Sequence, residues 1–437
     1  MSRIIRKSGW PIVIVAAVLV PLLLWMDARN LSLLVASPWA FSLALGRLLG
    51  VMGICFYSIN LILSSRWRFI EALFGGLNRV YIAHHIIGGI ALIMLLFHPI
   101  VLAIARASSS WYGSLAFLLP STDIAKNLGI LALTGMVLLL ILTFYIKLPY
   151  GLWKFTHKFL GLFFVIALLH ILLINSGLTS NLALKAYIFG LATIGLIAFI
   201  YRTLLPRVFV RTYDYTVKSV KLLKPNVVEV AMVPKTEQLS FKPGQFIFIS
   251  FVDSSQVSRE SHPFSIESAD NKSHITIVAK MIGDYTKTLS KLEVGTRARI
   301  EGAYGGFSYT DFPATEQIWI AGGIGITPYV AMARHLIKKP QLKVDLYYSC
   351  KTKDEFLYLD TLFADLIKKN PNFRLIKSVS DQEGFLNADK IVSTSGEVIG
   401  KEIFICGPPG MMQALSGQLI KKGVKKNNIH SEEFSIQ

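Results

Sequence analysis

The chain has 437 residues, of which 53% are hydrophobic and only 16% are charged, and its mean hydropathy is +0.51. This balance is too apolar for an ordinary soluble enzyme and too charged for a protein that lies wholly inside a bilayer. The formal net charge is +18, and residues 1–211 carry most of it, with 17 of the 45 Lys and Arg residues but only 3 of the 27 Asp and Glu residues. Because membrane topology explains cations in an apolar half, the charge gives no support for nucleic-acid binding. Three cysteines exclude a disulfide scaffold and a CxxC frame for zinc or an iron–sulfur cluster.

Charges interrupt the first half at intervals that suit membrane-spanning helices, which need about 20 apolar residues each. A signal peptide fits the first apolar run poorly, because no small-x-small cleavage pattern follows it. Most flanking cations fall on one side, so the positive-inside rule predicts that both termini and everything after residue 205 are cytoplasmic. The uncharged stretches predict six spans, at 9–26, 39–63, 80–105, 124–146, 154–174 and 183–204.

Five of the nine histidines lie in two of these spans, and four of them form two pairs. Ionisable residues inside a membrane are costly and usually functional. The third and fifth spans run in the same direction, so His84 can face His157 near the cytoplasm, and His98 can face His170 nearer the outside. The step from His84 to His98 corresponds to about 21 Å along a helix. This pattern predicts two stacked haems, each held by two histidines.

Helical geometry fits the two pairs unequally. Fourteen residues return a helix to within about 40° of its starting face, whereas thirteen leave it about 140° away. The step of thirteen residues from His157 to His170 therefore predicts a π-bulge, or strongly rotated haems. His85 is an alternative inner ligand, because it also lies thirteen residues before His98. Interfacial or helix-packing histidines are the alternative to haem ligands.

Arg47 is an unusual cation on the outer half of the second span. It could pair with a haem propionate or with an anionic product of oxygen on the outer side. Snorkelling to the outer interface explains it equally well.

After residue 205 the sequence changes to alternating apolar runs such as 245–250 and 273–278, which are typical of strands. To about residue 312 the pattern predicts a small antiparallel β-barrel. Two polar segments interrupt it, His-Pro-Phe-Ser at 262–265 and Gly-Asp-Tyr-Thr at 283–286. The second opens a helix, whose free N–H groups could hold a diphosphate. An ordinary turn with an N-cap is the alternative.

From residue 313 strands alternate with helices, which predicts an α/β domain. One strand ends in a glycine-rich loop at 322–328, and another ends in Gly-Pro-Pro-Gly at 407–410. Glycines between a strand and a helix let backbone amides approach a pyrophosphate. Two such strand ends on one parallel sheet predict a nucleotide crevice, with plain connecting loops as the alternative.

In this order, the paired histidines, HPFS, GDYT, GGIGITP and CGPPGMM resemble the bacterial NADPH oxidases of the ferric reductase superfamily, which carry a ferredoxin-NADP reductase-like tail. The resemblance covers most of the chain. It implies a multi-domain fold with a six-helix haem-binding transmembrane bundle at 1–205, an antiparallel FAD-binding β-barrel at 206–312 and an α/β NAD(P)-binding domain at 313–437. It also implies that His84 and His157 bind the inner haem b, and that His98 and His170 bind the outer one.

The resemblance implies roles in the soluble half as well. The flavin and ribityl chain of FAD would contact His262, Pro263, Phe264 and Ser265. The FAD phosphates would lie against Lys280, Gly283, Asp284 and Thr286. The pyrophosphate of NADPH would lie against Gly322, Gly323, Gly325, Thr327 and Pro328, and its nicotinamide would border Cys406, Gly407 and Pro408. Phe434 matches the terminal aromatic that stacks on the isoalloxazine. Arg47, Phe434 and Cys406 are then the residues expected at the reacting groups.

Two positions depart from this pattern. Soluble relatives usually carry Arg where His262 stands. Lys351 stands where many NADPH-dependent relatives have Arg, and a lysine can pair with a 2′-phosphate but lacks the bidentate fork. NADPH therefore stays the expected donor, ahead of NADH.

The implied activity is an NADPH oxidase in the bacterial plasma membrane, which moves electrons from cytosolic NADPH through FAD and two b-type haems to oxygen outside and produces superoxide. No EF-hand loop or SH3-binding proline tract is present in the sequence, so no obligate regulatory subunit is expected. The alternatives are a ferric-chelate reductase, an electron relay to another extracytoplasmic acceptor, and a transporter or sensor whose histidines relay protons.

Overall fold

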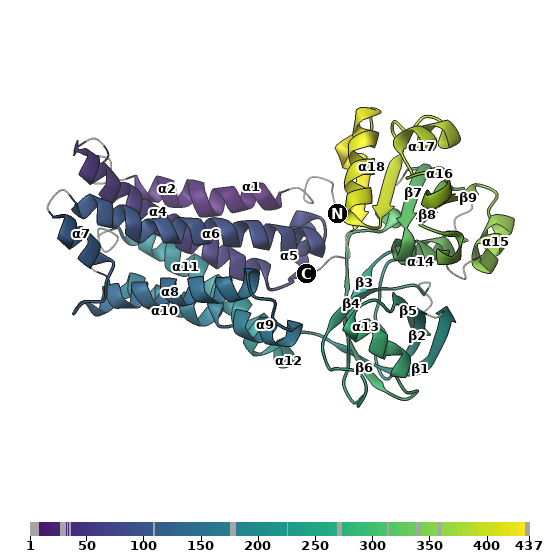
Figure 1. Ribbon diagram of the computed structural model, residues 1–437, viewed down its shortest axis with the longest axis horizontal. Coiled ribbons are helices and arrows are strands. Elements are labelled where there is room, and N and C mark those ends of the chain that lie inside the picture. Colours follow the sequence, from purple (N-terminus) through teal and green to yellow (C-terminus); the bar gives the residue numbers. More distant parts are fainter. Residues whose placement is uncertain are drawn as a thin grey trace. The chain divides into compact units, whose positions relative to one another are not determined.

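The chain folds as two compact units, Met1–Val210 and Arg211–Gln437. The computed structural model describes residues 8–26, 32, 34, 36–107, 110–174, 181–224, 226–268, 273–312, 314–337, 341–356 and 360–432. Figure 1 shows that the first unit is made of helices and that the second contains two sheets with helices around one of them.

The first unit is a bundle of long apolar helices joined by short ones. The polar side chains of Ser37, Asp123 and Asn181 cap the helices that follow them, each accepting a backbone N–H three residues further on. Its elements are α1 (Gly9–Ile14), a π-helical turn (Val15–Leu19), α2 (Val20–Trp25), α4 (Pro38–Leu63), α5 (Arg68–Phe74), α6 (Leu77–Arg106), α7 (Trp111–Phe117), α8 (Ile124–Phe144), α9 (Tyr150–His157), α10 (Leu160–Leu173), α11 (Leu182–Phe199), a second π-helical turn (Ile200–Leu204) and α12 (Pro206–Phe209).

Five helical segments are long and apolar enough to cross a membrane, and they confirm five of the six predicted spans. They are Pro38–Leu63, Leu77–Arg106, Ile124–Phe144, Tyr150–Leu173 and Leu182–Leu204. The first predicted span corresponds to a shorter apolar helix, Gly9–Trp25. The count of six spans therefore stays a prediction.

The bundle is built from helix pairs that approach closely at glycines. α4 packs against α6 and α11, and α8 packs against α10. A Cβ atom placed on Gly46, Gly50 or Gly53 of α4 would lie 2.7–2.8 Å from a side chain of α6. Gly135 of α8 is tighter still, because a Cβ there would lie 2.0 Å from the ring of Phe163 on α10. Small residues of this kind let helix backbones approach in a membrane.

The predicted π-bulge between His157 and His170 is wrong, because the helix is tightened at this point instead. α9 ends at His157, and Lys158, Phe159 and Gly161 each donate to the carbonyl three residues earlier. A residue in such a turn adds about 20° of rotation relative to an α-helix. Three such residues therefore reduce the angle between the directions of His157 and His170 around the helix axis from about 140° to about 80°. A π-bulge would unwind the helix and increase this angle.

The second unit begins with an antiparallel sheet in the order β4-β3-β6-β1-β2-β5. Its strands are β1 (Tyr213–Lys224), β2 (Val227–Pro234), β3 (Phe246–Phe251), β4 (His262–Ser265), β5 (Ile275–Lys280) and β6 (Arg297–Tyr304), with α13 (Asp284–Thr288) and a 3₁₀ turn (Leu289–Lys291) after β5. Among the described residues no ladder joins the edge strands β4 and β5, although Glu267 N–H donates to the Thr276 carbonyl at 2.9 Å. The predicted antiparallel β-barrel is therefore a half-barrel, and apolar side chains such as Ile247, Ile249 and Ile300 fill its interior.

The unit continues with a parallel sheet in the order β11-β10-β7-β8-β9. Because β8 and β9 lie on one side of β7 and β10 and β11 on the other, the direction of the chain reverses between β7 and β10. This switch point is where parallel sheets bind ligands. The strands are β7 (Glu316–Gly322), β8 (Lys343–Cys350), β9 (Phe373–Val379), β10 (Glu402–Cys406) and β11 (Ile429–Glu432), and the α-helices are α14 (Thr327–Leu336), α15 (Asp360–Lys369), α16 (Ser380–Glu383), α17 (Ala388–Ser395) and α18 (Pro409–Lys421).

Candidate functional site

The structure brings together the two histidines predicted for the inner site. The rings of His84 on α6 and His157 at the end of α9 have centroids 6.4 Å apart, with an angle of 56° between their planes. Imidazole nitrogens bind metals at about 2 Å, so two imidazoles on opposite sides of one metal have centroids about 6 Å apart. The observed spacing therefore suits two ligands of one metal ion. His85 lies with its ring centroid 6.0 Å from that of His84, and its side chain is exposed.

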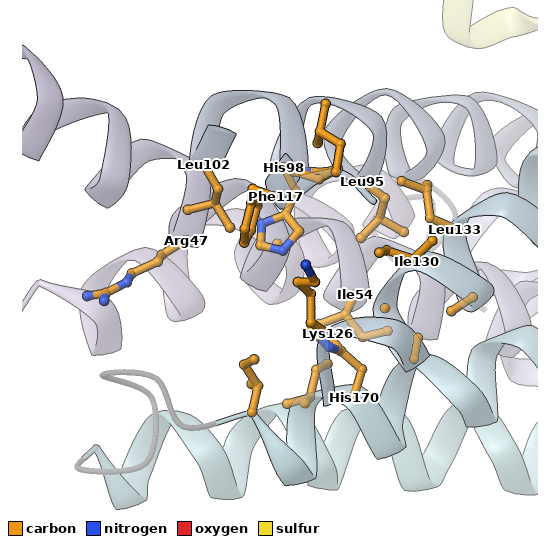
Figure 2. A pocket seen from close by; sticks show the side chains of 18 of the residues that line it. Arg47, Ile54, Leu95, His98, Leu102, Phe117, Lys126, Ile130, Leu133 and His170 are labelled. Atoms are coloured by element: carbon orange, nitrogen blue, oxygen red, sulfur yellow. The ribbon is translucent and has the colours of Figure 1, made fainter. Parts of the chain in front are cut away.

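The two histidines predicted for the outer site line one cavity. Its volume is about 720 Å³, and its lining includes His98, His170, Gly50 and Gly129. Figure 2 shows that His98 and His170 point into the same space from opposite sides. A Cβ atom on Gly50 would lie 2.7 Å from Nδ1 of His98, and one on Gly129 would lie 2.9 Å from Nδ1 of His170. The glycines thus provide the room in which each imidazole lies.

All four histidines use Nδ1 for a hydrogen bond to a neighbouring helix. On α6, His84 Nδ1 lies 3.1 Å from the Asn60 carbonyl oxygen, and His98 Nδ1 lies 2.6 Å from the Gly46 carbonyl oxygen, both on α4. In the other pair, His170 Nδ1 lies 2.7 Å from the Ala125 carbonyl oxygen, and His157 Nδ1 lies 3.5 Å from Oγ1 of Thr143. A carbonyl can only accept, so at three of the four rings Nδ1 carries the proton and Nε2 keeps its lone pair. Metal-bound histidines are oriented in this way.

These sites fit a metal ion whose ligands come mostly from a prosthetic group and only partly from the protein. Within the parts of the chain that the structure describes, no group of three or more His, Cys, Asp and Glu side chains could hold a metal ion. Two facing imidazoles next to a large cavity fit an iron whose remaining ligands belong to a macrocycle.

The cavity is also lined by three cations, Arg47, Arg106 and Lys126. Figure 2 shows Lys126 reaching between His98 and His170, whereas Arg47 extends away from them. The ring of Phe117 on α7 lies 3.9 Å from the Arg106 guanidinium carbon and 5.6 Å from the Lys126 Nζ. Sequence reasoning gave Arg106 and Lys126 no role. One signal was available, because Lys126 lies in the first turn of a helix, where the macrodipole disfavours a cation.

His262 lies on β4 and stacks on Tyr285, with ring centroids 3.7 Å apart. Its Nε2 lies 3.1 Å from Oε2 of Glu260. Burial, and then the charge of Glu260, raise the pKa of Tyr285, so its hydroxyl stays protonated. Phe264 and Ser265 are buried on the same strand. Sequence reasoning missed Tyr285, although it lies inside the GDYT motif.

The GDYT segment forms a short capped turn. Gly283 N–H donates to Oγ1 of Thr286, which donates back to the Gly283 carbonyl, both at 3.1 Å. Asp284 and Gly283 are exposed. The Thr286 hydroxyl therefore stabilises the start of α13 in the structure.

The two strand ends that were predicted to form a nucleotide crevice, those of β7 and β10, are neighbours at the switch point. These strands are parallel neighbours, with Ala321 opposite Cys406. A Cβ atom on Gly325 would lie 2.4 Å from the Cys406 carbonyl oxygen, and one on Gly407 would lie 3.0 Å from Cα of Gly322. Gly323 has a φ of +53° with open space around it. Thr327 and Pro328 begin α14 directly after this loop.

Two lysines of the antiparallel sheet form an ion pair and hydrogen bonds with the loop after β8. Lys280 Nζ, at the end of β5, lies 3.6 Å from Oε1 of Glu355, and Lys224 Nζ donates to the carbonyls of Asp354 and Phe356. Lys351 is exposed in this loop, and its N–H donates to Oε2 of Glu355. That hydrogen bond, together with Lys280, lowers the pKa of Glu355. Lys280 is thus paired with a carboxylate, and its place at the FAD phosphates stays a prediction.

Cys406 is fully buried at the end of β10. Burial, and then the charge of Glu432, raise the pKa of its thiol well above the usual value, so the sulfur is protonated. Glu432 ends β11 and is itself buried, and sequence reasoning missed it. Gly407 and Pro408 follow Cys406 and are more exposed. Phe434 lies outside the described residues.

Three family descriptions match successive parts of the chain. Residues 49–168 match the ferric reductase like transmembrane component, residues 212–316 an FAD-binding domain, and residues 319–417 an oxidoreductase NAD-binding domain. The chain thus combines a ferric reductase-like transmembrane component with FAD-binding and NAD-binding oxidoreductase domains. Its described helices and these domains make it a membrane protein that uses NAD(P)H.

The curated proteins that resemble this chain include reductases and an NADPH oxidase. The chain is 27% identical over 208 residues to the glycine betaine monooxygenase reductase subunit of Chromohalobacter salexigens, which covers 44% of this chain and 56% of that protein. It is 27% identical over 213 residues to NADH-cytochrome b5 reductase 1 of Cryptococcus neoformans, which covers 44% of this chain and 72% of that one. It is 29% identical over 175 residues to a superoxide-generating NADPH oxidase heavy chain of Dictyostelium discoideum, which covers 33% of each chain. The match thus spans little more than half of the first relative and a third of the oxidase.

Among solved structures, flavohemoglobin from Malassezia yamatoensis matches with a TM-score of 0.52 at 16% identity, over 94% of this chain and 100% of that one. At this identity the likeness concerns the fold alone.

Proposed function

We propose that the chain is a superoxide-generating NADPH oxidase, with a haem-binding domain at 1–205, an FAD-binding domain at 206–312 and an NADPH-binding domain at 313–437. One NADPH on the cytosolic side gives up two electrons and releases one proton, and two oxygen molecules outside each take up one electron. The products are NADP⁺ and two superoxide ions, so atoms and charges balance.

The arrangement of the four histidines carries this proposal. Two pairs lie near opposite ends of α6 and of the helical segment Tyr150–Leu173, and each ring has Nδ1 turned to a neighbouring helix. Proton-relaying histidines of a transporter need both ring nitrogens to exchange protons. Three of the Nδ1 atoms are held at backbone carbonyls instead, which keeps Nε2 of those rings ready to bind iron. His84 and His157 would hold the inner haem, and His98 and His170 the outer one.

The soluble unit supplies the donor side. Bound FAD and haem would supply the change from hydride to single-electron transfer and the passage of electrons across the bilayer. His262, Pro263, Phe264 and Ser265 would hold the flavin beside Tyr285, with Gly283, Asp284 and Thr286 at its phosphates. Lys280 would steady the loop that carries Lys351, whose amino group would pair with the 2′-phosphate of NADPH.

The switch point would bind the rest of the nucleotide. Gly322, Gly323, Gly325, Thr327 and Pro328 would let backbone amides approach the pyrophosphate. Cys406, Gly407 and Pro408 would border the nicotinamide, and the protonated thiol of Cys406 adds no charge there. Phe434 would cover the flavin.

The outer cavity would bring oxygen to the electron-donating end. Arg106 and Lys126 line it beside His98 and His170 and would neutralise the carboxylates of the outer haem. Arg47 would stabilise the anionic product near the outer mouth. His98 and His170 would hold the outer haem, which would supply the electron that oxygen takes up.

The deciding experiment gives NADPH to the purified full-length chain and follows cytochrome c reduction with and without superoxide dismutase. We expect dismutase to abolish most of the signal and His98→Ala to abolish oxygen reduction. His274→Ala, on the soluble unit away from the site, is the matched control and should behave like wild type. Reduction that dismutase does not inhibit would refute superoxide as the product.

A ferric-chelate reductase is the second candidate, because the transmembrane match is to a ferric reductase like component. The cations Arg47, Arg106 and Lys126 could attract an anionic chelate to the same cavity. Comparing oxygen consumption with Fe(III)-citrate reduction, both at saturating NADPH, separates the two activities. Faster reduction of the chelate under air would favour the reductase.

A further inference from the structure

We infer that Thr143 is a positioning residue that sets the reduction potential of the inner histidine site, and that the outer site has the more negative potential of the two. This inference rests on the proposed function, because it takes the four histidines as haem ligands.

The hydrogen bonds of the two sites differ in length and in acceptor. At the outer site, Nδ1 of His98 and of His170 lie 2.6 Å and 2.7 Å from backbone carbonyls. At the inner site, Nδ1 of His84 lies 3.1 Å from a carbonyl, and Nδ1 of His157 lies 3.5 Å from the Thr143 hydroxyl. N–H···O bonds are typically 2.7–3.2 Å long and weaken beyond that range. Both outer bonds are therefore stronger than both inner ones.

The Thr143 hydroxyl can serve His157 only as an acceptor. Its proton is donated to the Leu139 carbonyl one turn earlier on α8, at 2.8 Å. With that proton engaged, the oxygen can only accept, so Nδ1–H of His157 donates to Thr143. Of the four acceptors this is the only side chain, and it is therefore the one that a substitution can remove.

The chemical consequence follows from the basicity of the ligand. An acceptor that draws the Nδ1 proton makes the imidazole a stronger electron donor at Nε2. A stronger donor stabilises ferric iron more than ferrous iron and lowers the reduction potential. The short carbonyl bonds make the outer couple the more negative one, and the weak bond to Thr143 leaves the inner couple higher.

A potentiometric titration of the purified full-length chain, followed by the haem absorption bands, tests both parts. In Thr143→Val the more positive couple should rise while the more negative couple stays in place and haem content stays unchanged. A tenfold loss of the preference for ferric iron corresponds to about 59 mV for a one-electron couple. Thr143→Ser keeps the hydroxyl and should restore the wild-type value.

Thr193→Val is the matched control, because Thr193 on α11 makes the same hydroxyl bond to the carbonyl one turn earlier but is exposed on another helix. His98→Ala identifies the outer couple, and we expect the more negative one to disappear. The inference is overturned if Thr143→Val shifts neither couple more than Thr193→Val does, or if His98→Ala removes the more positive couple. Wild-type protein without haem bands would overturn the proposed function itself, and the inference with it.

Discussion

Gly50 gives the most direct test of how the outer histidines are held. In Gly50→Ala the new methyl group would lie 2.7 Å from Nδ1 and 2.8 Å from Cε1 of His98. Ordinary contacts are about 3.5–4.0 Å long, so the imidazole has to retreat from α4 by about 0.8 Å or more. Its bond partner, the Gly46 carbonyl, lies on the same helix one turn away, so the 2.6 Å hydrogen bond lengthens as the ring retreats. We expect the bond to be lost, at an overpacking cost of about 1–3 kcal/mol.

Loss of such a supporting bond typically weakens metal binding about 10- to 100-fold. The haem content per chain, measured as the pyridine complex after purification, should fall from two towards one, and the inner bands should remain. Gly190→Ala is the matched control, because Gly190 lies on α11 with open space around its Cα and should keep both haems. A Gly50→Ala protein with two haems and unchanged spectra would show that His98 does not lie against α4 as described.

Three further substitutions address the soluble unit. Tyr285→Leu removes the ring that stacks on His262, a contact worth about 0.5–1.5 kcal/mol, and should weaken flavin retention roughly two- to tenfold. Tyr285→Phe keeps the ring and should keep the flavin. Equal flavin content in both proteins would contradict the stacking role. Gly325→Ala forces a methyl group to 2.4 Å from the Cys406 carbonyl oxygen, so the KM for NADPH should rise severalfold. Gly417→Ala is the control, because its methyl group has no atom within 4 Å. An unchanged KM in Gly325→Ala would place the nucleotide elsewhere. Arg374→Met leaves the buried Asp345 carboxylate without its two 2.6 Å bonds, and the half-exposed guanidinium suggests a loss of about 1–3 kcal/mol in the free energy of unfolding at pH 7. Burial opposes ionisation of Asp345, but hydrogen bonds from Arg374 and Ser395 outweigh it and lower the pKa of its carboxyl group. The stabilisation is therefore present above the ordinary pKa of Asp and is lost as the pH falls through the lowered pKa. Thermal unfolding should show that the stabilities of the wild type and Arg374→Met converge in acid, and a difference that stays constant with pH would contradict this.

The sequence predicts most of the architecture because its signals are local. Uncharged runs between cations locate five of the described spans, since a bilayer excludes charge along the whole helix. Strand ends marked by glycine locate the switch point, and the register of β7 with β10 agrees with it. The first helix is harder, because Gly9–Trp25 is apolar but shorter than the other spans. The half-barrel was predicted as a β-barrel because alternation along each strand contains no information about whether the edge strands β4 and β5 pair.

The supporting contacts of the histidines could not be predicted, because they are made between helices. Backbone carbonyls at Gly46, Asn60 and Ala125 act as acceptors. Every residue has a backbone carbonyl, so the sequence does not show which ones accept these hydrogen bonds. Tyr285 was missed for a related reason, since its partner His262 lies on a distant strand. The tightened turn after His157 was also out of reach, because no proline or glycine marks residues 158–159.

The supporting contacts explain how two helices can hold a large group without packing against each other. α6 packs on α4 and α10 packs on α8, and each histidine is oriented by the helix behind it. Gly50 and Gly129 stand behind His98 and His170, so each imidazole lies against its own partner helix and points into the shared cavity. The orientation of each imidazole is thus set by contacts within its own helix pair, α6 with α4 or α10 with α8, and does not depend on contacts across the cavity. Because the acceptors behind the outer pair belong to the backbone, evolution can vary the side chains around the cavity without losing the orientation of its ligands.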